Sequence, residues 1–138
     1  MNLMGIDIGT TSVKAACFDE TLTQTLHFNI DYTLETCGNM VEFEPEKYWD
    51  IVRSVLEQVE GDIDALAVDT QCETLILTDE NGKPVRKAIV WLDNRAAKEA
   101  AEIENHFGKK KVYEITGQPE ITAAWPACKL LWIKKNEP

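Results

Sequence analysis

The fold is decided near the N-terminus by the stretch GIDIGTTSVKA, residues 5–15. The apolar segment that ends at Ile8 predicts a short strand, and the apolar run from Val13 to Phe18 predicts a second one. Gly9 allows a sharp turn between them and a close approach of a ligand, because it has no Cβ. The pattern therefore predicts strand, turn and strand, rather than a phosphate loop followed by a helix.

The side chains of this turn predict a phosphate site. Backbone N–H groups around Gly9 to Thr11 can form an anion-binding concavity, and nearby hydroxyl and amino groups add donors: Thr10, Thr11, Ser12 and Lys14. Asp7 would repel phosphate unless a cation lay between them, and Mg²⁺ prefers carboxylate and phosphate oxygens. A plain polar hairpin is the alternative interpretation.

Composition narrows the class of protein. The 138 residues suit one domain with its own core. A net charge of −10 argues against a nucleic acid or an anionic membrane surface as partner. No apolar run approaches the ~20 residues of a membrane span, and no apolar signal core precedes the first strand. We expect a cytoplasmic protein whose four cysteines are free thiols.

The remaining pattern alternates strands and helices. Alternation over residues 26–32 predicts a third strand, and helical spacing after Pro45 predicts a helix that Gly61 ends. Residues 63–68 predict a buried strand. Further helices are expected over 95–107 and from Pro126, the latter with Leu130, Leu131 and Ile133 on its apolar side, and the lysines at 109–111 are expected in a loop.

Polar residues follow two of the predicted strands. Gln71 and Glu73 come after the strand at 63–68, where open α/β sheets place ligands, and both can hydrogen-bond a polyol. Trp91 ends the apolar run from Ala88 and offers an aromatic face for sugar C–H groups. The alternatives are that residues 69–73 cap the strand and that Asp93 or Asn94 caps the next helix.

Three segments match one family in order. They are residues 5–15, residues 69–95 with GKP at 82–84 and IVWLDNR at 89–95, and residues 115–132 with ITG and PACKLLW at their ends. The chain resembles the N-terminal part of an FGGY carbohydrate kinase, closer to xylulose-kinase-like members than to glycerol kinases. The resemblance implies an α/β fold, a ribonuclease-H-like half of the actin and hexokinase superfamily. In the implied mixed sheet, which has flanking helices, the first three strands are antiparallel and the strand that begins at Ile63 runs parallel.

The resemblance also implies roles for single residues. The family transfers the γ-phosphoryl group of ATP to a hydroxyl of a sugar or polyol. Asp7 would help to hold Mg²⁺, and the turn residues Gly9, Thr10, Thr11, Ser12 and Lys14 would contact the nucleotide phosphates. Two groups would contact the sugar: Gln71, Cys72 and Glu73, then Trp91, Asp93 and Arg95. Because Cys72 and Glu73 replace the methionine and histidine common in xylulose kinases, a pentulose is expected but other sugars stay open.

Length is the largest departure from the family. The family's catalytic aspartate, adenosine pocket and second domain lie beyond the position of Pro138. We therefore expect residues 1–138 to be a partial N-terminal domain without catalytic base or C-terminal domain, and to be inactive or nearly so alone. Asp69 is the single weak candidate for a base.

Other hypotheses stay open for the chain as given. An incomplete sheet leaves a strand edge unpaired, so a homodimer is one hypothesis. A non-catalytic nucleotide- or sugar-binding module and an actin- or chaperone-like interaction domain are alternative functions.

Overall fold

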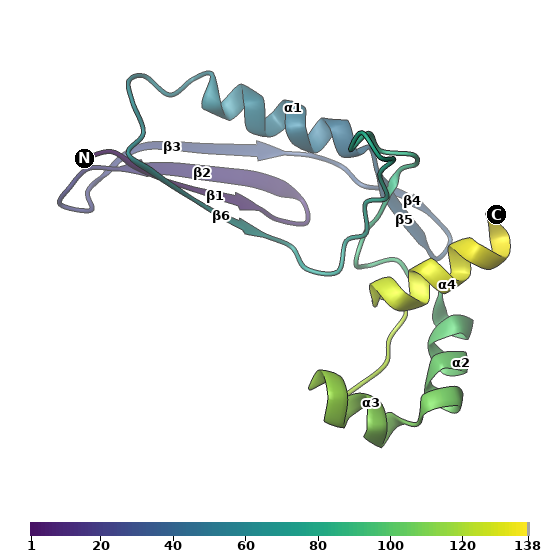
Figure 1. The fold of residues 1–138 in the computed structure, drawn as a ribbon. Coiled ribbons are helices and arrows are strands. Elements are labelled where there is room, and N and C mark those ends of the chain that lie inside the picture. Colours follow the sequence, from purple (N-terminus) through teal and green to yellow (C-terminus); the bar gives the residue numbers. More distant parts are fainter. Residues whose placement is uncertain (138) are drawn as a thin grey trace. The chain divides into compact units, whose positions relative to one another are not determined.

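A computed structural model describes residues 1–137, which form two compact units (Figure 1). Unit 1 contains residues 1–34 and 44–72, and unit 2 contains residues 35–43 and those from 73 onward.

Unit 1 is built on a four-stranded mixed sheet. Its strands are β1 (Leu3–Ile8), β2 (Ser12–Phe18), β3 (Gln24–Asp31) and β6 (Ala65–Thr70), in the order β3-β2-β1-β6. The first three pair antiparallel, whereas β6 runs parallel to β1. The predicted strand directions are thus confirmed.

One face of this sheet is covered by helix α1 (Pro45–Leu56), as Figure 1 shows. Alternate residues of β1 and β2 point to this face, among them Ile6 and Ala15, which lie opposite each other in the register. They pack in one core with Val55 of α1, which is fully buried. Pro45 suits the first turn of α1 because it has no N–H to leave unpaired. The helix ends at Leu56, and Gly61 lies in the following turn, so the predicted stop was wrong.

Strand β6 differs from the prediction of a buried strand. It forms the edge of the sheet, and all its residues are exposed. Leu66 and Val68 pair in register with Met4 and Ile6, yet remain 53% and 56% exposed, whereas Met4 and Ile6 are buried. A short apolar run predicts a strand, but it does not say whether a helix covers that strand.

Unit 2 contains a small antiparallel sheet of β4 (Glu35–Cys37), β5 (Met40–Phe43) and β7 (Ala88–Ile89), and three helices. The helices are α2 (Ala97–Phe107), α3 (Lys109–Thr116) and α4 (Pro126–Asn136). The lysines at 109–111 therefore begin a helix rather than form a loop, because Val112 provides that segment with a buried anchor. Helix α4 buries Cys128 and Lys129. Of its predicted apolar side, Leu131 and Ile133 are half-buried, whereas Leu130 is exposed and that part of the prediction was wrong.

The four cysteines are free thiols, as the sequence predicts. Within residues 1–137, no helix combines the length and apolar character that a bilayer crossing needs.

Ile6 of β1 is buried whereas Val68 of β6 is exposed, so the two side chains should contribute differently to stability. Ile6→Ala removes buried side-chain volume under α1 and should lower the free energy of unfolding by roughly 3 kcal/mol. Val68→Ala, its register neighbour on β6, should cost less than about 1 kcal/mol because the side chain is already exposed. Urea unfolding of both variants measures the difference, and equal losses would show that β6 is covered in solution.

Candidate functional site

The predicted phosphate turn is the tight connection between β1 and β2. The backbone N–H of Gly9 donates to the carbonyl oxygen of Ser12 at 3.0 Å, so Thr10 and Thr11 form the connection itself. A Cβ on residue 9 would lie 3.2 Å from that oxygen, closer than side-chain carbons normally approach, which explains the glycine. The Gly9 N–H is thus bonded inside the hairpin, and the anion concavity around Gly9 to Thr11 stays a prediction.

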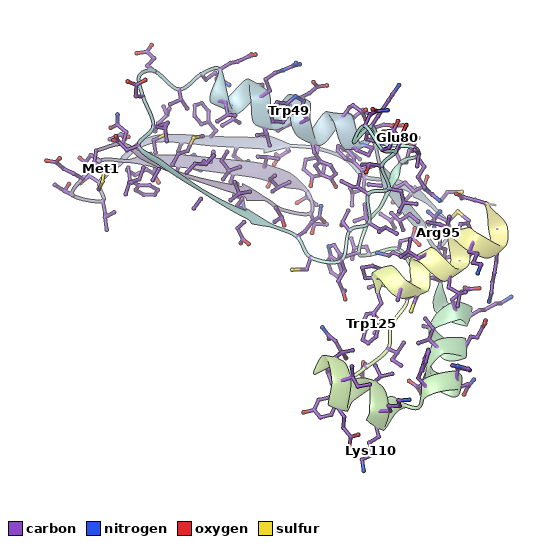
Figure 2. The ribbon with its side chains drawn as sticks, in the orientation of Figure 1. Met1, Trp49, Glu80, Arg95, Lys110 and Trp125 are labelled. Atoms are coloured by element: carbon purple, nitrogen blue, oxygen red, sulfur yellow. The ribbon has the colours of Figure 1, made fainter. Side chains whose placement is uncertain are left out.

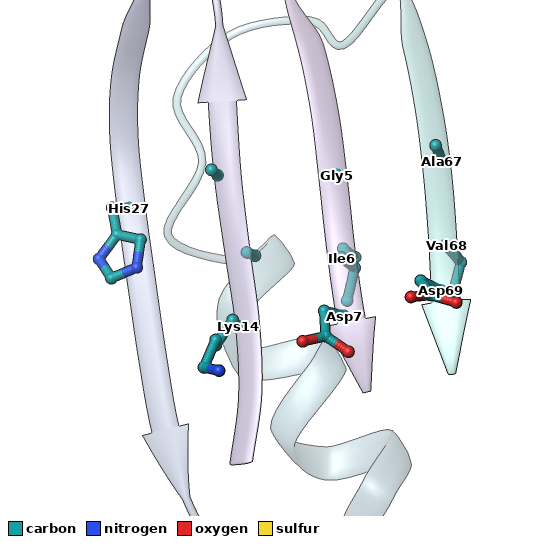
Figure 3. Close-up of a pocket in the computed structure, with 10 residues that line it drawn as sticks. Gly5, Ile6, Asp7, Lys14, His27, Ala67, Val68 and Asp69 are labelled. Carbon is teal, nitrogen blue, oxygen red and sulfur yellow. The ribbon is translucent and has the colours of Figure 1, made fainter. Parts of the chain in front are cut away.

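One amide and three charged side chains form a row across the open face of the same sheet. The register aligns Asn29, Lys14, Asp7 and Asp69 on four adjacent strands. Figure 3 shows Lys14, Asp7 and Asp69 on the same side of the sheet. The Asp7 carboxylate also lies beside the turn, since both its oxygens are within 3.9 Å of the Cβ position of residue 9. The row therefore places opposite charges next to the connection.

A shallow depression of about 360 Å³ adjoins this row. Small residues form its floor, because Gly5, Ala16 and Ala67 align in the neighbouring register row. Asp7 and Lys14 line it, and so does the exposed His27 of β3 (Figure 3). Small residues leave room over the sheet, so the charged groups can be reached by a ligand.

The other turn residues differ in accessibility. Thr11 and Lys14 are exposed and Thr10 is half-buried, whereas Ser12 is only 8% exposed. Among residues 1–137 there is no cluster of three histidine, cysteine or acidic side chains that could hold a metal. A magnesium ion here would thus depend on Asp7 together with oxygens of a phosphate ligand and water, which is how proteins commonly bind this ion.

Gln71 lies next to the phosphate turn. Its backbone N–H donates to the carbonyl oxygen of Ile8 at 3.0 Å, and its side-chain Nε2 donates to the Tyr48 hydroxyl at 3.0 Å. Tyr32 holds the turn from the other side, through its N–H to Thr11 at 2.9 Å and its hydroxyl to the carbonyl oxygen of Gly9. Unit 1 therefore brings Gln71 close to the nucleotide candidates, and the exposed Cys72 follows it.

Glu73 belongs to unit 2 and has an unusual backbone conformation. Its φ of 62° lies in the left-handed region, which residues other than glycine seldom occupy. The carbonyl oxygen of Glu73 accepts a hydrogen bond from Lys129 Nζ at 2.7 Å, and those of Val90 and Ile89 accept from the same amine at 3.2 and 3.4 Å. Burial lowers the pKa of Lys129 to about 8. The amine ties the Glu73 segment to the end of β7.

Asp93 and Arg95 form a buried ion pair. Arg95 Nε donates to both carboxylate oxygens at 3.0 Å, and a further Arg95 nitrogen donates to Asp93 at 2.8 Å and to Glu42 at 2.7 Å. Asp93 also accepts the Val41 N–H at 2.6 Å, and the guanidinium stacks 5.0 Å from the Trp132 ring centroid. Burial opposes the charge on Arg95, but hydrogen bonds to Asp93 and Glu42 prevail and raise its pKa. Helix α2 begins at Ala97 with Ala96 as its N-cap and without a side-chain cap, so neither Asp93 nor Asn94 caps it.

The sequence reasoning missed a group of residues around Glu73. A depression of about 310 Å³ in unit 2 is lined by Glu73 and by the residues that precede α4: Gln118, Pro119, Glu120, Thr122 and Trp125. Carboxylates, an amide, a hydroxyl and an indole face are groups that suit a polyol. Trp91 does not line this depression, and its backbone N–H donates to the Thr74 hydroxyl at 3.3 Å. From the sequence no role was assigned to residues 118–124, although Gln118, Glu120 and Thr122 place polar side chains just before Trp125.

Comparison with known proteins identifies the family. Residues 2–138 match the FGGY family of carbohydrate kinases, N-terminal domain. The chain belongs to this family, and its fold is the ribonuclease-H-like fold of the actin and hexokinase superfamily.

The names of the relatives indicate different substrates. A gluconokinase of Bacillus subtilis is 34% identical over 95% of this chain, and a xylulose kinase of Lactococcus lactis is 29% identical over 99%. The crystal structure of xylulose kinase from Rhodospirillum rubrum superposes with a TM-score of 0.92 at 26% identity and covers 100% of this chain. The resemblance to carbohydrate kinases, including xylulose kinases, is thus confirmed.

This chain is much shorter than those relatives. It spans 26% of the Bacillus gluconokinase, 28% of the Lactococcus xylulose kinase and 30% of the Rhodospirillum chain.

The buried Asp93–Arg95 pair gives a second stability prediction. Asp93→Asn leaves the guanidinium buried with a weakened partner and should lower the free energy of unfolding by roughly 3 kcal/mol or more. Glu114→Gln breaks an exposed pair with Lys110 and should cost less than about 0.5 kcal/mol. Urea unfolding followed by near-ultraviolet circular dichroism compares them. Equal stability of the two variants would contradict a structural role for the pair.

Proposed function

We propose that this chain is the N-terminal, phosphate- and sugar-contacting domain of an ATP-dependent sugar kinase. In this proposal the kinase transfers the γ-phosphoryl group to a hydroxyl of a pentulose or a related sugar or polyol. The observation that carries the proposal is the row of Lys14 and Asp7 beside the Thr10–Thr11 connection, in a chain that belongs to a carbohydrate kinase family.

The nucleotide part is assigned to unit 1. Lys14 would attract the phosphates, and Thr10 and Thr11 would donate hydrogen bonds to them, because these groups lie at the same end of the β1–β2 hairpin. Asp7 would hold Mg²⁺ through its carboxylate. Ser12 is largely buried and would support the connection, while Gly9 would contribute the close approach of its backbone. Bound magnesium ATP would supply the phosphoryl group that is transferred.

Candidate sugar-contacting residues are proposed for each unit separately, with Gln71 and Cys72 in unit 1 and the others in unit 2. Gln71 and Cys72 follow β6, and Glu73 lines the polar depression with Gln118 and Trp125. Trp91, 39% exposed, is available to a sugar face, whereas Asp93 and Arg95 would shape the segment that carries Trp91. Such residues position a hydroxyl for transfer, and positioning with charge stabilisation accounts for most catalysis of phosphoryl transfer.

Proton removal from the sugar hydroxyl needs a base at hydrogen-bond distance. We assign no residue of this chain to that role. Asp69 lies in register beside Asp7 on the exposed edge strand, where it neighbours the proposed cation site. The relatives are about three to four times longer, so we propose that residues 1–138 act as a partial domain and that base and second domain belong to a longer protein.

The nucleotide assignment predicts binding without turnover. The purified chain should bind magnesium ATP in calorimetry, and Asp7→Asn should weaken binding by roughly tenfold, because one charged contact is worth about 1.5 kcal/mol or more. Asp31→Asn, which neutralises an exposed carboxylate on β3 of the same sheet, is the control and should bind as the parent does. A coupled assay with D-xylulose, gluconate and glycerol should show no turnover. Turnover abolished by Asp7→Asn would mean that the chain contains its own base.

The sugar assignment predicts a tryptophan signal. Titration with the same three compounds should change the fluorescence of Trp125, and Trp125→Phe should remove the change. Glu73→Gln should weaken binding of the responding sugar by roughly fivefold through loss of a charged acceptor. Trp49→Phe on α1 (Figure 2) is the control, since that indole is 58% exposed. A response to none of the three would favour a nucleotide-binding module over a sugar kinase domain.

Self-association is proposed for the isolated chain through β6. This edge strand exposes Leu66 and Val68 and offers unpaired backbone groups to a second copy. Sedimentation velocity at rising concentration should show a dimer that Val68→Lys weakens. A monomer at all concentrations would contradict the dimer.

A further inference from the structure

Tyr32 contacts the phosphate turn twice. Its N–H donates to the carbonyl oxygen of Thr11, and its hydroxyl donates to the carbonyl oxygen of Gly9, so one residue bonds both sides of the Thr10–Thr11 connection. Because Tyr32 directly follows β3, these bonds fix the connection to the third strand of the sheet. The orientation of the turn therefore depends on the position of this side chain.

The Tyr32 hydroxyl also belongs to a chain of hydrogen-bonding groups. The ring of Tyr32 meets that of Tyr48 edge to face, with centroids 5.5 Å apart. Burial and the neighbouring Tyr48 raise the pKa of Tyr32, so its hydroxyl keeps its proton at neutral pH and remains a donor to Gly9. Tyr48 in turn accepts the Gln71 amide at 3.0 Å. A path of contacts thus runs from Gln71 to the turn, with a hydrogen bond at each end and the ring contact of the two tyrosines between them.

At the other end of this path, the side-chain oxygen of Gln71 lacks a hydrogen bond from the described residues. Its Oε1 is buried, and within residues 1–137 no hydrogen-bond donor reaches it. A buried acceptor without a partner typically costs about 1–3 kcal/mol, which a donor from a ligand would recover. A sugar hydroxyl is such a donor once the half-buried Gln71 side chain opens to it, and the proposed function already assigns Gln71 to the sugar.

We propose that Tyr32 is a positioning residue that couples Gln71 to the phosphate turn, so that a sugar at Gln71 and a nucleotide at the turn strengthen each other's binding. A hydroxyl bonded to Oε1 fixes the amide, the amide fixes Tyr48, and Tyr32 then holds the Gly9 carbonyl oxygen in one orientation. Each ligand meets a turn that the other has already ordered. This inference rests on the proposed function.

Calorimetry measures the coupling directly. Affinity of the 138-residue chain for Mg²⁺ and a non-hydrolysable ATP analogue is determined with and without saturating D-xylulose, or with gluconate or glycerol if that compound is the one that binds. We expect the sugar to tighten nucleotide binding by roughly three- to tenfold, the effect of about one hydrogen bond. Tyr32→Phe should reduce this factor to near one while each ligand still binds alone.

Two further variants separate coupling from simple loss of structure. Tyr48→Phe removes the acceptor of the Gln71 amide and should also abolish the factor, and it serves as the test if Tyr32→Phe does not fold. Tyr113→Phe alters a tyrosine that is 55% exposed on α3 and should leave the factor unchanged. Thermal unfolding confirms that each variant is folded.

The outcomes distinguish this inference from the proposed function. A factor that disappears in Tyr32→Phe and Tyr48→Phe supports the inference. A parent chain that binds both ligands independently, or a folded Tyr32→Phe that keeps the full factor, overturns it and leaves the proposed function standing. A parent chain that binds neither ligand overturns both.

Discussion

The hydrogen bond from Gly9 to Ser12 fixes the register on which unit 1 depends. It closes the β1–β2 hairpin so that Ile6 lies opposite Ala15 and Asp7 lies opposite Lys14. Because side chains alternate between the faces of a sheet, a slip by one residue would expose the apolar set and bury the charged set. One short connection therefore determines both the face that α1 covers and the face that carries the candidate nucleotide residues.

Further hydrogen bonds hold that connection in place from the neighbouring strands. Tyr32, which directly follows β3, donates hydrogen bonds to the carbonyl oxygens of Gly9 and Thr11. Gln71, which directly follows β6, donates its N–H to the carbonyl oxygen of Ile8 at the end of β1. A turn with two threonines has many conformations when isolated, and these bonds restrict it before any ligand arrives. Such preorganisation reduces the ordering cost of binding, which is otherwise subtracted from affinity.

Unit 2 uses buried charge for a different purpose. Lys129 gathers three carbonyl oxygens, and Arg95 gathers the carboxylates of Asp93 and Glu42, so segments distant in sequence are held by polar contacts. A buried charge that loses its partner is costly, which makes these networks specific for one arrangement. The left-handed conformation of Glu73 is maintained next to such a contact. Its side chain can then line the polar depression with Trp125.

The sequence by itself determined the β1–β2 hairpin, the three antiparallel strands and the family, because periodicity, Gly9 and ordered motifs are local signals. Asp7, Lys14 and Glu73 were identified as candidates on residue type and position. Only the tertiary structure decided that β6 is an exposed edge, that Asp93 and Arg95 are buried together, and that Trp125 rather than Trp91 lines the depression with Glu73. The burial of a strand beneath a helix and the contacts between side chains depend on residues far apart in the chain, so no local pattern contains them. The path from Gln71 to Gly9 is of this kind, since its two tyrosines became neighbours only through packing of α1 on the sheet.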